Sequence, residues 1–378
     1  MRKVVIAGFC RSPFTPAQKG QLARVRPDDL AACVVKGLIN DSGVNPDDIE
    51  DLILGCAFPE GEQGFNLARI IVHIAELPIS IAGTTINRFC GSSMQAIHNA
   101  AGAIQMRAGE VFICAGVESM SRIPMGGFNP LPNPVLYKNY PQAYISMGET
   151  AENLALNYLI KRKAQEMFAL TSQQKAYAAQ QNGFFADEII PIPYGQTLIS
   201  EDGCLRPTST LQALAELPPA FLKNGSVTAG TSSPLTDGAA AVLVCSEDYA
   251  DAHGLPKLAR IKAIAVSACA PEIMGIGPVL ASQKALQRAG LNLADIDIVE
   301  LNEAFAAQAL AVLQELPIAP EKLNLDGGAI ALGHPLGASG ARITGKAASL
   351  LKREGKQYAL ATQCIGGGQG IATILEAI

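Results

Sequence analysis

One cysteine stands where a nucleophile is expected. Cys90 follows a run of β-forming residues and precedes Gly91 and a helical pattern with apolar side chains at positions 94, 97, 101 and 104. It is therefore predicted to lie at a helix N-terminus, where unsatisfied backbone N–H groups favour thiolate over thiol. Such a residue could attack a carbonyl carbon. The alternative is a buried structural cysteine, which is the more common fate of a free thiol.

A histidine and a second cysteine could supply proton transfer. His334 lies in a stretch with five glycines, residues 327–340, which can hold an accessible imidazole on a tightly turned backbone. A solvated loop histidine is the alternative. Cys364 closes a predicted strand before a glycine run, so that a thiol and free backbone N–H groups meet at one place, as an oxyanion site requires. Here the alternative is a hairpin turn with an inert thiol.

Two further segments have polar or glycine patterns. Asn302 and Glu303 end a predicted strand and precede a helix over 306–316, where N-capping is the alternative role. Residues 340–347 partly match the phosphate-loop motif of nucleoside triphosphatases. However, Ala347 stands where that loop needs a Mg²⁺-binding hydroxyl, and no strand directly precedes the segment. The sequence therefore does not predict ATP binding.

The composition limits the class of protein. The chain has 378 residues, of which 49% are hydrophobic and 17% charged, with a net charge of −5. It is long enough for two or three domains, and no apolar run approaches the roughly 18 residues of a membrane span. The acidic balance and the absence of Trp argue against nucleic-acid binding. Nine cysteines without close pairs indicate no disulfide framework or metal knuckle and favour the reducing cytoplasm.

A weak internal repeat organises the elements that must position these residues. A helical stretch ends near Gly43 and another near Gly290, and after each an Asp-Ile turn leads into an apolar strand. The offset between the two copies is constant, 290 − 43 = 247. One supersecondary unit has therefore been used twice.

The halves match only if the middle of the chain is an insertion. The segment 121–141 contains five prolines and excludes long regular elements, and helical patterns follow over 149–159 and 164–181. We predict a first half of residues 1–120 plus 226–255, a loop domain of 121–225 over the site, and a second half of 256–378. The two α/β halves should have the same topology and pack face to face.

Four motifs together resemble the thiolases, in the family's order and along the whole chain. They are Cys90-Gly91-Ser92-Ser93-Met94, Asn302-Glu303-Ala304-Phe305-Ala306-Ala307-Gln308, Gly333-His334-Pro335 and Cys364-Ile365-Gly366-Gly367-Gly368-Gln369-Gly370. The resemblance implies the thiolase fold, in which two βαβαβαββ halves form a five-layered αβαβα core with an inserted loop domain. It also implies a homodimer or homotetramer and leaves open a hydratase/dehydrogenase subunit as a partner.

The resemblance further implies an acyltransferase that needs no permanently bound cofactor and no metal, with coenzyme A as a substrate. Cys90 would be the nucleophile, His334 the base and Cys364 the second acid/base. Asn302, through a water, and the N–H of Gly366 would help to hold the oxyanions. The implied coenzyme A contacts are Arg206, Ser233, Met147 and Phe305.

Within the family the sequence is most similar to degradative 3-ketoacyl-CoA thiolases, which cleave 3-ketoacyl-CoA in fatty acid β-oxidation. Biosynthetic acetoacetyl-CoA thiolases carry His before the Met-Gly of the loop domain, where this chain has Ser146. Ser146 is therefore expected to leave a roomier acyl site. The alternatives are a biosynthetic acetoacetyl-CoA thiolase and, from another class, a non-catalytic acyl-CoA-binding or scaffold subunit.

Overall fold

The computed structural model describes residues 2–378. The first half of the chain contains a complete βαβαβαββ unit. Strands β3, β4 and β5 are parallel, whereas β8 is antiparallel to both β5 and β1. The elements in chain order are β1 (Val4–Arg11), α1 (Pro27–Ser42), β3 (Asp51–Gly55), α2 (Leu67–Ile74), β4 (Ala82–Ile86), α3 (Ser92–Gln105), β5 (Val111–Ser119) and β8 (Thr236–Ser246).

The second half repeats this topology with one strand reduced. Its parallel pair is β10 and β11, and β12 is antiparallel to both β11 and β9. Where the first half has β4, the second has only a parallel bridge between Leu323 and Val299. The elements are β9 (Ala259–Ala268), α9 (Gly277–Ala289), β10 (Ile298–Leu301), α10 (Ala306–Glu315), α12 (Ser339–Glu354), β11 (Tyr358–Ile365) and β12 (Gln369–Glu376).

The predicted repeat is confirmed at its helix ends. Gly43 and Gly290 both stop a helix in the left-handed conformation, with φ of 69° and 68°. A side chain other than glycine is strained at such an angle, which explains why both copies use glycine there. A short 3₁₀ turn and then a buried strand follow each of the two glycines.

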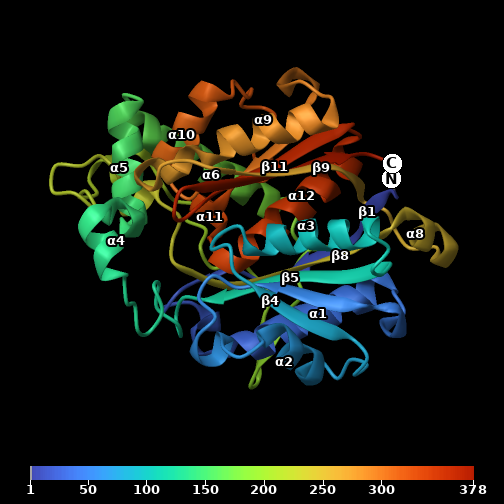
Figure 1. The fold of residues 1–378 in the computed structure, drawn as a ribbon. Coiled ribbons are helices and arrows are strands. Elements are labelled where there is room, and N and C mark those ends of the chain that lie inside the picture. The colour runs from blue at the N-terminus through green and yellow to red at the C-terminus, as the bar shows by residue number, and fades with distance from the viewer. Residues whose placement is uncertain (1) are drawn as a thin grey trace.

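The strands form a continuous sheet in the order β10-β11-β12-β9-β1-β8-β5-β3-β4. Its two ends face each other, and α3 and α12 lie between them (Figure 1). Helices α1 and α2 cover one outer face, and α9 and α10 cover the other. This gives the five layers αβαβα, so the predicted fold class is confirmed.

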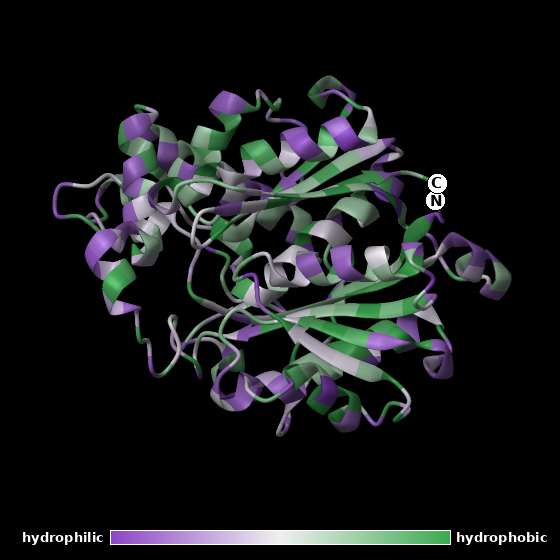
Figure 2. Ribbon diagram, in the orientation of Figure 1, coloured by the Kyte–Doolittle hydropathy of each residue, from purple (hydrophilic) through white to green (hydrophobic). Residues whose placement is uncertain are grey.

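Burial on both faces explains the composition of the strands. All residues of β5 and β8 are buried, and these strands are mainly apolar rather than alternating, as expected for a sheet covered by helices on both sides. The central layer brings α3 and α12 against both halves in one apolar cluster. Figure 2 shows hydrophobic strands and, on the outer helices, hydrophilic residues that face away from the sheets.

The chain between β5 and β8 holds mainly helices. They are α4 (Pro134–Asn139), α5 (Met147–Asn157), α6 (Arg162–Gln181) and α7 (Leu211–Ala215), with a small hairpin of β6 (Ile192–Tyr194) and β7 (Thr197–Ile199). In the proline-rich stretch 121–141 the only α-helix is the six-residue α4. The division of the chain into 1–120 plus 226–255, 121–225 and 256–378 stays a prediction.

The segment that resembles a phosphate loop is helical. Gly345 and Lys346 lie inside α12, so the backbone there is occupied by helical hydrogen bonds. Lys346 is buried and forms ion pairs with Glu188 and Asp326, at 2.9 and 2.6 Å. A phosphate cannot reach a lysine that two carboxylates already hold.

Candidate active site

Cys90 lies on a tight turn between β4 and α3. The preceding residue, Phe89, has a φ of 44°, a left-handed angle that is strained for a bulky side chain. Ser92 holds this turn: its Oγ accepts a hydrogen bond from the N–H of Arg88 at 2.8 Å and donates to the carbonyl of Phe89 at 2.6 Å. Helix α3 begins at Ser92, so Cys90 lies at its N-terminus, as expected.

The expected thiolate is not the resting form of Cys90. Burial raises the pKa of the Cys90 thiol to about 12. The backbone N–H groups of Gly366 and of Cys90 itself favour the thiolate and lower this pKa, but their effect is smaller. The negative charge of Glu118 raises this pKa further. Desolvation therefore outweighs the helix N-terminus, and the thiol must lose its proton to a base when it reacts.

His334 is held on both ring nitrogens. Its Nδ1 lies 2.5 Å from the Oγ of Ser339, and its Nε2 lies 3.3 Å from the Nδ2 of Asn302. Its backbone N–H donates to the Oγ1 of Thr236 at 2.9 Å. The imidazole is buried with 4% of its surface exposed, so the solvated loop histidine that was the alternative is excluded.

These contacts assign the tautomer of His334. The Ser339 hydroxyl donates to the carbonyl of Pro335 at 3.2 Å and so accepts from Nδ1, which carries the ring proton. Because Asn302 presents an N–H, Nε2 is the unprotonated nitrogen. Burial, followed by the charge of Arg342, lowers the pKa of His334 to about 3. The ring is therefore neutral, with its basic nitrogen already formed.

Cys364 and Gly366 lie at the turn between β11 and β12. Cys364 pairs with Gly370 across the hairpin, and its side chain is 1% exposed. Burial and the neighbouring Cys90 raise the pKa of the Cys364 thiol well above its ordinary value. Gly367 and Gly368 have φ of 79° and 84°, and this turn aims the N–H of Gly366 at the sulfur of Cys90.

Cys90, His334 and Cys364 line one cavity of about 140 Å³, which the chain brings together from both halves. Three of the four predicted coenzyme A contacts, Met147, Ser233 and Phe305, also line it. The remaining wall is mostly apolar and consists of Met120, Met125, Gly148, Phe221, Ser232, Pro234, Leu235, Met274, Ala304 and Leu336.

Other predicted residues lie outside the cavity lining. Asn302 is fully buried behind His334, and its Oδ1 has no hydrogen-bond partner among residues 2–378. Arg206 is exposed and is not among the lining residues. Ser146 does not line this cavity either, so the cavity lends no support to the expectation that it sets the width of the acyl site. Its side chain is exposed and caps α5, because Oγ accepts from the N–H of Glu149 at 3.3 Å.

The sequence reasoning missed several residues that hold the site. Ser339 and Thr236 fix His334, and the Nε2 of Gln363 donates to the carbonyl of Cys90. Glu118 faces Cys90 from β5. One signal was available: Glu118 is a charged residue at the end of an otherwise apolar strand, just as Asn302 follows β10.

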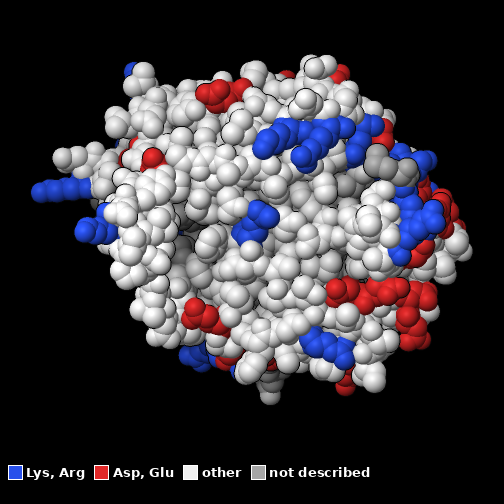
Figure 3. Space-filling model, in the orientation of Figure 1, with Lys and Arg blue, Asp and Glu red and all other residues white. Residues whose placement is uncertain are grey.

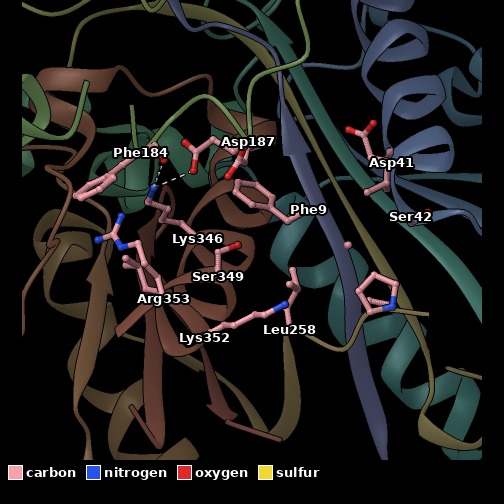
Figure 4. Close-up of a pocket in the computed structure, with 16 residues that line it drawn as sticks. Phe9, Asp41, Ser42, Phe184, Asp187, Leu258, Lys346, Ser349, Lys352 and Arg353 are labelled. Atoms are coloured by element: carbon pink, nitrogen blue, oxygen red, sulfur yellow. Dashed lines mark hydrogen bonds and ion pairs between the residues drawn. The ribbon is translucent and has the colours of Figure 1, made fainter. Parts of the chain in front are cut away.

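A second, larger groove of about 560 Å³ contains none of the predicted site residues. It lies between α1, α12, β1 and the segment around Asp187. There Nζ of Lys346 lies 3.5 Å from the carbonyl oxygen of Phe184, and Arg353 lies under the Phe184 ring (Figure 4). Two of its basic side chains are held in ion pairs, Lys346 with Glu188 and Arg353 with Asp326, which lies outside the groove lining.

Neither a metal site nor a membrane span emerges within the described part of the chain. Residues 2–378 hold no group of three or more His, Cys, Asp or Glu side chains placed to bind a metal ion. No helix in the same range is long and apolar enough to cross a bilayer.

Comparisons with known proteins agree with the motifs. A family model of the thiolase N-terminal domain matches residues 4–248, and one of the thiolase C-terminal domain matches residues 255–377. The chain is 46% identical over 389 residues to the 3-ketoacyl-CoA thiolase of Bacillus subtilis (strain 168) and 48% identical over 386 residues to that of Aliivibrio fischeri. Each of these two alignments covers 100% of both proteins.

Solved structures are similar over the same length. The human mitochondrial 3-ketoacyl-CoA thiolase in complex with CoA has a TM-score of 0.92 at 41% identity, with 100% of this chain and 98% of that chain covered. The Bacillus anthracis acetyl-CoA acetyltransferase also has a TM-score of 0.92, at 40% identity, with 100% and 99% covered.

Proposed function

Because this chain belongs to the thiolase family over both of its domains, we propose that it cleaves 3-ketoacyl-CoA with coenzyme A. The products are acetyl-CoA and an acyl-CoA shortened by two carbons. Full-length relatives at 46% and 48% identity that carry the name 3-ketoacyl-CoA thiolase support this substrate. The chain is accordingly an acyltransferase, with coenzyme A as a substrate rather than a resident cofactor.

In the first step the sulfur of Cys90 attacks the 3-keto carbon, and the thiol proton passes to Nε2 of His334. The bond between C2 and C3 then breaks, the acyl group stays on Cys90 as a thioester, and the departing acetyl-CoA enolate takes the proton of Cys364. The position of both side chains around one cavity, with Nε2 of His334 as the unprotonated ring nitrogen, supports this assignment.

In the second step coenzyme A gives its thiol proton to the Cys364 thiolate and attacks the thioester on Cys90. The shortened acyl-CoA leaves, and Cys90 recovers its proton from His334. No electrons or additional reactants are needed, because Cys90 recovers its own proton from His334, and the proton that Cys364 gave to acetyl-CoA is replaced by the thiol proton of coenzyme A.

Two developing negative oxygens need donors. For the tetrahedral intermediate at Cys90, the N–H groups of Cys90 and Gly366 are the proposed oxyanion hole, supported by their hydrogen bonds to the cysteine sulfur. For the thioester enolate, His334 and a water bound by Asn302 are proposed, and the unpartnered Oδ1 of Asn302 offers an acceptor for that water.

The single observation that carries the proposal is the meeting of Cys90, His334 and Cys364 around one apolar cavity. The test is covalent labelling. Incubation with an acyl-CoA that lacks the 3-keto group should leave an acyl thioester on Cys90, detected by intact mass and peptide mapping. A label on Cys364, or none, would contradict the assignment of the nucleophile.

The role of Cys364 has a separate test, because proton transfer and acylation are distinct steps. Cys364→Ala should reduce thiolysis by about 10²-fold or more while acylation of Cys90 stays detectable. If both reactions were lost together while the protein stayed folded, Cys364 would be a structural residue only.

A biosynthetic acetoacetyl-CoA thiolase is the second candidate, favoured by the equally close match to the Bacillus anthracis acetyl-CoA acetyltransferase. The acyl length separates the two. For the degradative role we expect kcat/KM to rise from acetoacetyl-CoA to a six- or eight-carbon 3-ketoacyl-CoA, and a preference for the four-carbon substrate would favour the biosynthetic role. A non-catalytic scaffold would show neither turnover nor an acyl-enzyme.

Contacts with the rest of coenzyme A are proposed for Met147, Ser233 and Phe305, which line the cavity. Phe305 packs edge-on against Phe221, with ring centroids 5.8 Å apart, and the two rings form an apolar wall for pantetheine. Arg206 is proposed to attract the phosphates from outside the cavity. Replacing Arg206 should therefore raise KM for coenzyme A without affecting acylation of Cys90.

A homodimer or homotetramer is proposed on the surface properties of one face. Strand β4 ends the sheet and pairs, within the described part of the chain, only with β3. The centre of the face over α3 and β4 is mainly uncharged, whereas charged side chains gather at its margin (Figure 3).

A cytoplasmic location is proposed from the nine free thiols. A hydratase/dehydrogenase subunit is a further proposed partner, and it should co-purify with this chain if the two form a complex.

A further inference from the structure

Glu118, near the end of β5, is a buried carboxylate that no cation neutralises. Its exposed fraction is 1%, and it takes part in none of the ion pairs within residues 2–378. Neutral donors surround it instead. They are the N–H groups of Ala57 at 2.8 Å, Phe58 at 3.2 Å and Gly337 at 3.0 Å, and the Nε2 of Gln63 at 2.8 Å.

One oxygen of this carboxylate joins the two halves of the fold. Oε2 accepts from Ala57, which follows β3, and from Gly337, which lies three residues after His334. A carboxylate is the side chain suited to this place, because it only accepts hydrogen bonds and has room for about four donors. A glutamine of the same length would offer one acceptor oxygen and would place an N–H₂ group against N–H donors.

The Ala57 side of this bridge continues to the nucleophile. The carbonyl of Ala57 accepts from Nδ2 of Asn87 at 2.9 Å, and Oδ1 of Asn87 accepts from the N–H of Phe89 at 2.8 Å. Phe89 is the strained residue directly before Cys90. In addition, Ala57 packs in one apolar cluster with Cys90. A displacement of the Glu118 carboxylate would therefore also displace the turn that carries Cys90.

The Gly337 side is equally constrained. A Cβ on Gly116 would lie 2.2 Å from the carbonyl oxygen of Gly337, and a Cβ on Gly337 would lie 2.8 Å from the Cα of Cys56. The loop after His334 therefore lies backbone against backbone on β3 and β5. Because no side chain separates these segments, a hydrogen bond at Gly337 sets their spacing directly.

On these grounds, and resting on the proposed function, we propose that Glu118 is a positioning residue for acyl transfer. It holds the His334 loop and the Cys90 turn at the separation that proton transfer requires. Burial raises the pKa of the Cys90 thiol and the charge of Glu118 raises it further, so that Cys90 stays protonated until His334 takes the proton. The thiol of Cys56, 3.8 Å from Oε1, is the other titratable group beside it.

Two variants separate reach from charge. Glu118→Asp keeps the charge but is one methylene too short to hold Ala57 and Gly337 together, and Glu118→Gln keeps the length but loses the charge. Both should lower kcat for thiolysis about tenfold or more, with KM changed less than about threefold, since misplacing reacting groups by about 1 Å costs up to 10²-fold. Only Glu118→Gln should alkylate faster at Cys90 with iodoacetamide at a given pH, by severalfold.

Glu303→Gln is the matched control. Glu303 is also buried and also held by neutral donors, namely Ser172, Asn324 and the N–H of Ile330. Its replacement should lower stability comparably but leave the alkylation rate of Cys90 unchanged. The proposal is overturned if both Glu118 variants keep kcat within twofold of wild type, or if Glu118→Gln does not alkylate faster than Glu303→Gln. If the wild-type protein showed no thiolysis, the proposed function would be refuted instead. The comparison of alkylation rates would then still test whether Glu118 acts on Cys90.

Discussion

Nδ1 of His334 lies 2.5 Å from Oγ of Ser339, the first residue of α12, and this contact decides which ring nitrogen is basic. The same helix packs against α3 and both ends of the sheet, so the imidazole is anchored to the central layer of the fold. A base fixed in this way needs no reorientation before it accepts a proton.

Ser339→Ala should lower kcat about 10- to 100-fold with little change in KM, because the imidazole loses the partner that fixes its tautomer. Steady-state thiolysis measures both constants. Ser349→Ala, on the same helix but facing the second groove, serves as the control and should behave as wild type. An unchanged kcat for Ser339→Ala would mean that Asn302 alone orients the ring.

Glu188→Ala should destabilise the fold by about 3 kcal/mol or more. Glu188 accepts from Arg11 of β1 at 2.8 Å and from Lys346 of α12 at 2.9 Å, and all three side chains are buried. Removing the shared carboxylate leaves two buried cations each short of a partner. Urea unfolding gives the free energy. Glu354→Ala, which removes an exposed partner of Arg353, should change it by less than about 1 kcal/mol.

His98 should make the protein less stable in acid. Its Nε2 contacts Oγ1 of Thr373 at 2.8 Å, and burial lowers the pKa of His98 from 6.5 to about 3. Between these two pH values the unfolded chain binds a proton that the folded chain does not. Stability is therefore retained above pH 6.5 and lost as the pH falls, by about 2 kcal/mol at pH 5.

The difference between wild type and His98→Gln isolates this effect. Burial raises the pKa of Glu300 to about 7, which acts in the opposite direction, but Glu300 is present in both proteins and its contribution cancels. The unfolding free energy of wild type minus that of the variant should fall between pH 7.5 and pH 5. A difference that is constant with pH would show that His98 titrates normally in the fold.

Ser146→His should leave the acyl-length preference unchanged, because Ser146 is exposed and caps α5 instead of lining the cavity. Its main effect should be a loss of about 1 kcal/mol of stability from the missing cap. Leu336→Phe, which adds bulk inside the cavity, should lower kcat/KM for an eight-carbon substrate relative to acetoacetyl-CoA. A changed length preference in Ser146→His would restore Ser146 as a specificity residue.

Local patterns in the sequence were enough to predict several elements and two of the helix ends. Gly43 and Gly290 predicted two helix ends in the left-handed conformation, and the repeat built on them predicted the common topology of the halves. Cys90 before α3 and Cys364 at the end of β11 were also predicted. These features depend on local periodicity and on the backbone angles that glycine permits, which a single segment shows.

The protonation and the contacts of the site residues depend on the folded chain as a whole. The helix start predicted a thiolate at Cys90, but burial by segments hundreds of residues away raises its pKa to about 12. Ser146 next to the Met-Gly pair gave no sign that its side chain is exposed and caps α5, and no local pattern joins Glu118 to Ala57 and Gly337. Desolvation and hydrogen bonding depend on which distant segments pack together, and that packing is absent from any local pattern.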